Sequence, residues 1–174
     1  MADHVVPSNT FAVLAFGANL GDREQTIRHA ALELAACPGI VSVELSSLVE
    51  SVAITEAGPS TDEPAYLNAV ALIDTTLSPR KLLQTVLNVE QLFGRVRSER
   101  WAARTLDIDI VAFGQERINE PDLVVPHPHA AQRLFVLNPW LELDPHATIV
   151  GAGSVATIAA ELEARQNQPA EVTP

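Results

Sequence analysis

The sequence is poor in cysteine and in basic residues, and each shortage excludes a class of protein. Cys37 is the single cysteine of the 174 residues, which excludes an internal disulfide and a cysteine-based zinc site. Lysine and arginine total 11 against 22 aspartates and glutamates, a formal net charge of −11. Such a charge repels nucleic acid and anionic lipid, so a polyanionic ligand would need a local basic cluster or a metal ion. We therefore expect neither a nucleic-acid partner nor a membrane partner.

Long apolar segments and glycine-rich phosphate loops are missing as well. No apolar run approaches the roughly 18 residues of a membrane-spanning helix, and residues 1–10 lack the pattern of a signal peptide. No Walker-type loop is present, which excludes a P-loop kinase. We expect a soluble cytoplasmic protein, with a monomer favoured over an oligomer. Residues 1–166 are expected to form a single domain and residues 167–174 a disordered tail.

Apolar periodicity predicts the order β-α-β-β-α-β. Strands are expected at 10–17, 40–51, 65–74 and within 100–114, with helices from Asp22 to Pro38 and from Ser78 to Gly94. Residues 55–64 are rich in turn formers and predict a loop. A loop, a short helix and a last helix starting near Ser154 follow the fourth strand. This order is that of an α+β, ferredoxin-like core, here with a C-terminal extension and a three-layer α/β/α arrangement.

Alternation within two predicted strands assigns their faces. In 40–51, Val41, Val43 and Leu45 alternate with polar neighbours, which predicts one buried and one wet face. In 65–74, Tyr66 and Asn68 fall on one face, and their neighbours along the strand fall on the other.

Asp107 and Asp109 are the first candidate functional residues. Strand alternation places both on one face, about 6.5–7 Å apart, with Leu106, Ile108 and Ile110 on the opposite face. Two carboxylates at this spacing repel each other unless a cation lies between them. Oxygen ligands of this kind suit Mg²⁺, which shares its coordination shell with phosphate. The alternative is that this face is simply exposed to water.

Four of the 11 basic residues lie within ten positions of one loop, next to the acidic pair: Arg95, Arg97, Arg100 and Arg104. The planar guanidinium fork suits phosphate oxygens. A carboxylate pair beside an arginine-rich loop fits polyphosphate chemistry, because charge develops on several oxygens at once. The alternative is a solvated loop whose arginines neutralise an acidic surface.

Other candidates lie outside this loop. His127, held between the prolines of VPHPH, can donate to a phosphate or a leaving group, or can be plain surface; His129 has no assigned role. Tyr66 and Phe135 can stack on a flat ring while Asn68 reads its edge, although each is also a common core residue.

Four segments, FGANLGD, AYLNAV, GRVRSERWAARTLDIDIVAFG and VVPHPHAAQRLFVLNPWLEL, occur in this order within residues 11–145. Together they resemble the 6-hydroxymethyl-7,8-dihydropterin pyrophosphokinases of folate biosynthesis. The resemblance implies transfer of pyrophosphate from ATP to the hydroxymethyl group of a reduced pterin, with release of AMP. It also implies two Mg²⁺ ions held by Asp107 and Asp109, and ATP and the pterin as small-molecule partners.

The resemblance further implies roles for single residues. Arg95 and Arg104 would lie on a loop that closes over the phosphates, with Trp101 packing it shut. Glu90 would hold the ribose, and the backbone of Ile110 would read adenine. The implied catalytic residues are Arg95, Arg104 and His127; the ATP-binding residues are Glu90, Arg97, Trp101, Ile110 and Arg133; the pterin-binding residues are Tyr66, Asn68 and Phe135.

Two segments depart from the family pattern. Ala102 and Ala103 stand where the family usually has Gly-Pro, and VESVA at 49–53 stands where it typically has Tyr-Glu-Thr-x-Pro. These departures leave open a catalytically weak relative that binds nucleotide or pterin as a regulatory module. A third reading is a metal-dependent nucleotidyl transferase on the same core, although no basic template-binding surface supports it.

Overall fold

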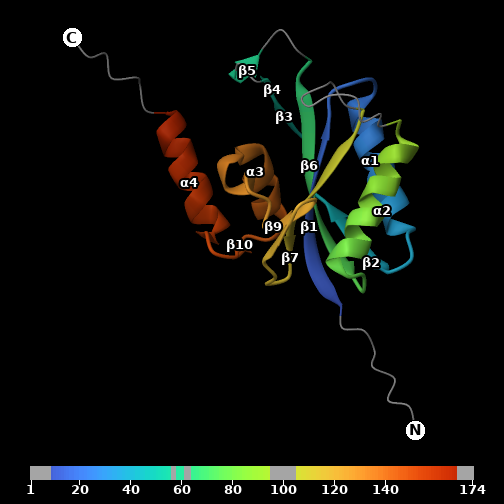
Figure 1. The fold of residues 1–174 in the computed structure, drawn as a ribbon. Coiled ribbons are helices and arrows are strands. Elements are labelled where there is room, and N and C mark those ends of the chain that lie inside the picture. Colours follow the sequence, from blue (N-terminus) through green and yellow to red (C-terminus); the bar gives the residue numbers. More distant parts are fainter. Residues whose placement is uncertain (1–8, 56–57, 61–63, 95–104, 168–174) are drawn as a thin grey trace, which may run out of the picture.

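The middle layer of the molecule is a five-stranded antiparallel sheet (Figure 1). The computed structural model describes residues 9–55, 58–60, 64–94 and 105–167. The main path of the sheet runs β2-β6-β1-β7, and β3 also pairs with β6. The strands are β1 (Thr10–Ala18), β2 (Ile40–Leu45), β3 (Val49–Ser51), β6 (Tyr66–Thr75) and β7 (Asp107–Phe113). Their order and antiparallel pairing confirm the ferredoxin-like core.

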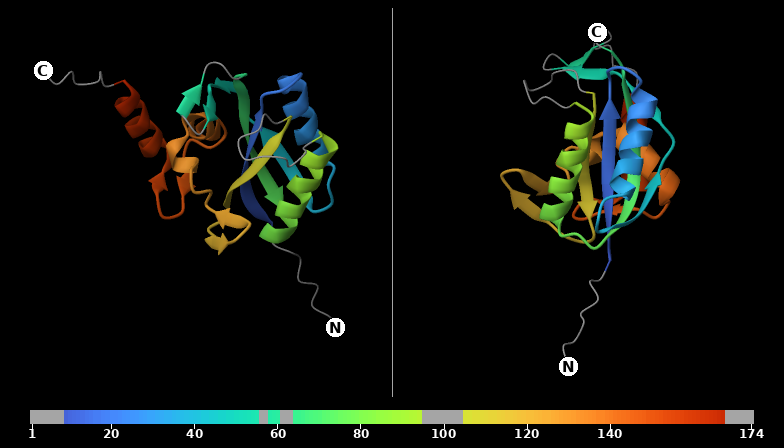
Figure 2. Two further views of the ribbon diagram at one scale, coloured as in Figure 1. Left: turned by 45° about the horizontal axis from the view of Figure 1, so that its top comes forward. Right: turned by 90° about the vertical axis from the view of Figure 1, so that its right-hand side faces the viewer.

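Helices cover both faces of this sheet (Figures 1 and 2). One face carries α1 (Arg23–Ala35) and α2 (Pro79–Leu92); the other carries α3 (Leu134–Leu143), against which α4 (Val155–Gln166) packs. Two apolar clusters fill the spaces, one on each side of the sheet. The predicted α+β class with three α/β/α layers is therefore confirmed.

The first two helices begin and end where local chemistry predicts. Asp22 Oδ1 accepts a hydrogen bond from the Gln25 backbone N–H at 3.0 Å and caps α1. Ser78 Oγ accepts from the Lys81 backbone N–H at 3.4 Å and caps α2, which starts at Pro79. Gly94 follows α2 with a φ of 78°, a conformation that favours glycine.

The predicted strand at 40–51 is two strands. The Ser46 side chain accepts a hydrogen bond from the backbone N–H of Val70 at 2.9 Å, and β2 ends at Leu45 while β3 starts at Val49. A register shift between Ile40 and Ser42 leaves Val41 57% exposed. The prediction of a buried Val41 is wrong, because the irregularity at this edge breaks the alternation.

Short elements that the periodicity did not predict complete the fold. The expected loop at 55–64 is corrected in part, since β4 (Ala53–Thr55) pairs with β5 (Gly58–Ser60). The C-terminal extension adds β8 (Ile118–Glu120) with β9 (Leu123–Val125), the 3₁₀ turn η1 (Ala130–Gln132), and β10 (Thr148–Ile149) with β11 (Gly153–Ser154).

The predicted tail lies, apart from Asn167, outside the described residues. Within the part of the chain that the structure describes, none of the helices has the length and apolarity needed to cross a membrane.

Candidate active site

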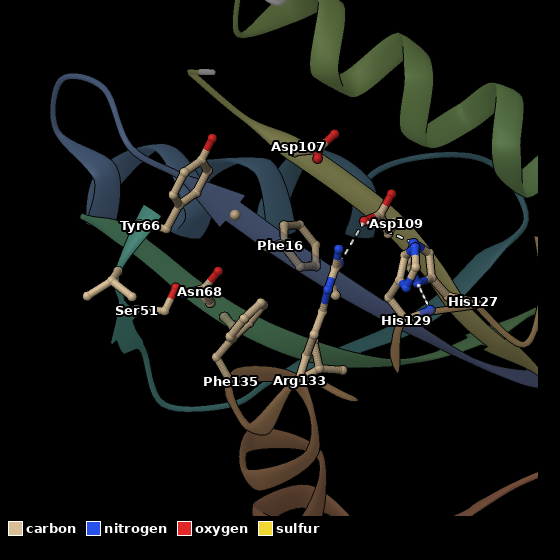
Figure 3. A pocket seen from close by; sticks show the side chains of 15 residues that line it. Phe16, Ser51, Tyr66, Asn68, Asp107, Asp109, His127, His129, Arg133 and Phe135 are labelled. Carbon is tan, nitrogen blue, oxygen red and sulfur yellow. Dashed lines mark hydrogen bonds and ion pairs between the residues drawn. The ribbon is translucent and has the colours of Figure 1, made fainter. Parts of the chain in front are cut away.

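A cavity of about 350 Å³ opens between the sheet and the start of α3 (Figure 3). This volume is within the usual range for small-molecule sites. Its walls come from β1, β3, β6, β7, the segment after β9 and the first turn of α3. The lining residues are Ala15, Phe16, Gly17, Ser51, Val52, Tyr66, Asn68, Ala69, Asp107, Asp109, His127, His129, Arg133, Phe135 and Val136.

The acidic pair lies on β7, with both side chains in the cavity wall. The pleat sends Asp107 and Asp109 to this face and Ile108 between them to the opposite core, where Ile108 is 4% exposed. The predicted orientation of the strand is therefore confirmed.

Asp109 meets two nitrogen-bearing side chains from other elements (Figure 3). Its Oδ2 lies 3.6 Å from His127 Nε2 and 4.0 Å from a terminal nitrogen of Arg133. Both distances exceed the roughly 3.2 Å of a direct hydrogen bond. The Asp109 side chain keeps 40% of its surface exposed, so this end of the cavity is charged and open to solvent. We call it the charged half: Asp107, Asp109, His127 and Arg133.

Backbone hydrogen bonds orient His127. Its own N–H donates to the Val111 carbonyl at 2.9 Å, and the His129 N–H donates to His127 Nδ1 at 3.2 Å. Because Nδ1 accepts, the proton of the neutral ring is on Nε2, which faces Asp109. Burial, together with the nearby charges of Arg133 and His129, lowers the pKa of His127 to about 4, against an opposing effect of Asp107. His127 is therefore a neutral N–H donor at pH 7.

The other end of the cavity is built from rings and an amide, and we call it the ring half: Tyr66, Asn68, Phe135 and Ser51. Strand alternation on β6 brings Tyr66 and Asn68 to the cavity face, as predicted, and α3 contributes Phe135. Asn68 is only 6% exposed, and its Nδ2 donates to Val49 O at 3.2 Å and to Ser51 Oγ at 2.9 Å. The guanidinium carbon of Arg133 lies 5.8 Å from the Phe135 ring centroid, where the two halves meet.

Two predicted site residues do not line the cavity. Glu90, on α2, is fully buried, and its Oε1 accepts a hydrogen bond from the Ile108 backbone N–H at 2.7 Å. The structure thus shows a partner of Glu90 on β7, and the ribose contact stays a prediction. The Ile110 side chain is in the core, 5% exposed. The predicted residues Arg95, Arg97, Arg100, Trp101 and Arg104 lie outside the described residues.

Eight residues of the cavity wall had no site role predicted from the sequence, among them Phe16, Ser51 and His129. His129 follows His127 by two positions, and the 5.9 Å between the centroids of their rings reflects this spacing. Ser51 reaches the cavity only through the register of β3 on β6, which periodicity does not give.

The acidic pair fits a magnesium ion better than a metal enclosed by protein ligands. Two carboxylates supply hard oxygen donors, but no cluster of three or more metal-binding side chains is found among the described residues. Mg²⁺ is commonly held by one or two carboxylates and completes its shell with water and substrate phosphate.

The chain as a whole is similar to one family of known proteins. Residues 13–145 match the family described as 7,8-dihydro-6-hydroxymethylpterin-pyrophosphokinase (HPPK). A 2-amino-4-hydroxy-6-hydroxymethyldihydropteridine pyrophosphokinase of Methylorubrum extorquens is 37% identical over 154 residues, which are 88% of this chain and 94% of the relative. The protein of the same name from Bacillus subtilis is 38% identical over 135 residues, 78% of each chain.

The fold is also found in solved structures. A crystal structure of wild-type Plasmodium falciparum HPPK-DHPS matches 91% of this chain with a TM-score of 0.68 and 14% sequence identity. The chain spans about half of that longer protein, 46% of its length. With the family match covering most of the chain and relatives above 30% identity, the chain belongs to the 7,8-dihydro-6-hydroxymethylpterin-pyrophosphokinase family.

Proposed function

We propose that this cavity carries out the reaction of its family, transfer of pyrophosphate from ATP to the hydroxymethyl group of 6-hydroxymethyl-7,8-dihydropterin, with release of AMP. The observation that carries the proposal is the division of the cavity. Carboxylates, an imidazole and a guanidinium line one end, and two aromatic rings and an amide line the other. The first set suits a polyphosphate and the second a flat heterocycle.

Asp107 and Asp109 would hold the magnesium, and the resemblance implies two ions. When bound, the metal supplies positive charge that neutralises the phosphate oxygens and polarises the phosphorus under attack. The two carboxylates share one face of β7, so the strand fixes their separation before any ligand arrives.

Arg133 and His127 would contact phosphate from the opposite side of the charged half. Arg133 offers a permanent positive charge, whereas His127 offers the neutral Nε2–H set by the His129 backbone. Donors fixed in advance stabilise charge that develops in the transition state without a cost of reorganisation. We therefore assign His127 to hydrogen-bond donation and not to proton transfer at pH 7.

Tyr66 and Phe135 would hold the pterin ring by stacking, with the Asn68 amide on its edge. Fixing the ring places its hydroxymethyl oxygen beside the phosphates, and such positioning can contribute about 7–11 kcal/mol to lowering a barrier. The contact between Arg133 and the Phe135 ring brings the phosphate-binding and ring-binding groups together.

The nucleotide base would lie at the outer edge of β7, on the side away from β1. This strand pairs with β1 on one side, and on the other side its Ile108 N–H is directed at Glu90. Alternation places the backbone groups of Ile110 on that same edge, where an adenine can exchange hydrogen bonds with them. Glu90 would hold this edge in place through its hydrogen bond with the Ile108 N–H.

A regulatory module without turnover is the second candidate, motivated by the altered segment at 49–53. Against it, residues 49–51 form strand β3, pair with β6 and deliver Ser51 to the cavity wall. Residues 49–51 therefore form this wall of the ring half although their sequence departs from the family pattern.

One assay separates the candidates. Purified protein is incubated with ATP, Mg²⁺ and 6-hydroxymethyl-7,8-dihydropterin, and the nucleotide products are resolved. AMP formation that Asp107→Ala abolishes supports the pyrophosphokinase. ATP binding without turnover supports the regulatory module. Release of free pyrophosphate supports a nucleotidyl transferase.

A further inference from the structure

Ser51 lines the cavity and has no role in the account so far. It is the last residue of β3, which pairs with β6 in the register Val49 to Asn68 and Ser51 to Tyr66. This register puts the side chains of Ser51 and Asn68 on one face of the sheet (Figure 3). The Ser51 hydroxyl accepts a hydrogen bond from Asn68 Nδ2 at 2.9 Å.

The surroundings of Asn68 determine which way its amide faces. A backbone carbonyl can only accept, so the group 3.2 Å from Val49 O must be the amide nitrogen. Ser51 Oγ takes the second N–H of the same nitrogen. Both donors of the amide are thus used inside the protein, and a ligand meets only its carbonyl oxygen.

That oxygen is directed at the ring half of the cavity. In Figure 3 it points away from Ser51, toward the space between the rings of Tyr66 and Phe135. Gly17 faces it, and a Cβ added at Gly17 would lie 3.6 Å from Asn68 Oδ1. Because Asn68 is 6% exposed, a ligand group that displaces its little remaining water must supply a hydrogen-bond donor.

We propose that Ser51 is a positioning residue that locks Asn68 as a hydrogen-bond acceptor toward the ligand, and so selects a ring edge that carries N–H donors. The inference rests on the proposed function, in which the ligand is a pterin whose amino-pyrimidinone edge presents such donors. A ligand with a carbonyl in place of the 2-amino group would set two acceptors against each other, and such a mismatch gives selectivity. Without Ser51, one N–H of the amide loses its partner and the amide is held by Val49 O alone.

The test compares Ser51→Ala with Ser51→Thr, which keeps the hydroxyl, and with Ser42→Ala, which makes the same chemical change at an exposed position of β2. Calorimetry measures the Kd of 6-hydroxymethylpterin and of its 2-oxo analogue, each with Mg²⁺ and a nonhydrolysable ATP analogue present, and separately the Kd of that ATP analogue. Steady-state assays give kcat and both KM values, and thermal melting reports the fold.

We expect Ser51→Ala to weaken binding of the amino pterin about three- to tenfold, the effect of one neutral hydrogen bond. The preference for the amino pterin over the oxo analogue should fall by a similar factor, with the Kd of the ATP analogue unchanged. Ser51→Thr should restore both values, and Ser42→Ala should match the wild type.

Three results would overturn the inference. A pterin Kd within twofold of wild type in Ser51→Ala would show that the hydroxyl does not position the amide. Equal losses for pterin and the ATP analogue, together with a lower melting temperature, would show a merely structural role. A wild-type protein that binds no pterin would remove the proposed function as well, which separates that failure from the other two.

Discussion

The two halves of the cavity are built in opposite ways. In the charged half, the side chains of Asp109, His127 and Arg133 are 21–40% exposed, and they approach one another at 3.6 and 4.0 Å. In the ring half, Asn68 is nearly buried and makes two direct hydrogen bonds to the protein. This difference indicates that hydrogen bonds within the protein fix the Asn68 side chain of the ring half before a ligand binds. The longer distances in the charged half leave room for a metal ion and phosphate.

The largest effect is expected from removing one charge of the acidic pair. Asp109→Asn should lower kcat by a factor on the order of 10²–10³, the cost of losing one electrostatic contact to developing charge. Because Asp109 faces the cavity and not the core, the melting temperature should change by no more than about 3 °C. Glu116→Gln, at an exposed turn, is the control and should retain full activity. A melting temperature that collapses while activity survives would contradict the metal role.

Glu90 should stabilise strand β7, which carries the two aspartates of the charged half. Glu90→Ala leaves the Ile108 N–H without its acceptor and opens a gap in the core, so the free energy of unfolding should fall by about 2–4 kcal/mol. Glu90→Gln keeps an acceptor for the Ile108 N–H and should lower the free energy of unfolding by less. Urea unfolding with a chelator present measures both. Unchanged stability combined with weaker ATP binding would favour the ribose contact over the tether to β7.

The ring half should respond to loss of an aromatic face and the charged half should not. Phe135→Ala should raise the KM for the pterin by about tenfold, since it removes a stacking surface. The KM for ATP should stay within twofold, because Arg133 keeps its charge. Initial rates with each substrate varied in turn provide both constants. Equal increases in the KM values for the pterin and for ATP would show that the two halves of the cavity do not bind separate parts of the substrates.

The smallest effect is a pH dependence of stability that arises from His127. Its ordinary pKa is 6.5, and in the folded protein it is about 4, so between these values the unfolded chain binds a proton that the folded chain does not. The contribution of His127 to the free energy of unfolding is therefore fully present above pH 6.5 and is lost as the pH falls toward 4. After allowance for partial exposure, the loss should be about 1–2 kcal/mol.

His127→Gln should flatten this slope, and His146→Gln, at an exposed position, should not. Denaturant unfolding of the metal-free protein at pH 4, 5, 6 and 7 measures the difference. Parallel curves for wild type and His127→Gln would show that the buried imidazole does not set the slope.

The orientation of the two aspartates on β7 and the positions of the long helices and strands could be predicted from the sequence, because both depend on the local periodicity of apolar residues. Two-residue alternation gave the faces of β6 and β7, and capping side chains gave the start of α1 and α2. The position of Glu90 was available in the same way, because it follows the buried Val86 by four residues on α2.

The contacts that no local pattern contains come from pairing and register. The interruption between β2 and β3 arises at Ser46, whose side chain binds the backbone of Val70, 24 residues away. The contact of Ser51 with Asn68 then depends on how β3 is set against β6. The place of His129 in the cavity wall likewise depends on the path of the chain after β9.

The most direct test of the account is a crystal grown with magnesium, a nonhydrolysable ATP analogue and 6-hydroxymethylpterin. We expect metal density in contact with both carboxylates of β7, phosphate oxygens beside His127 and Arg133, and the pterin between Tyr66 and Phe135. Bound nucleotide with no ion touching Asp107 or Asp109 would contradict the account.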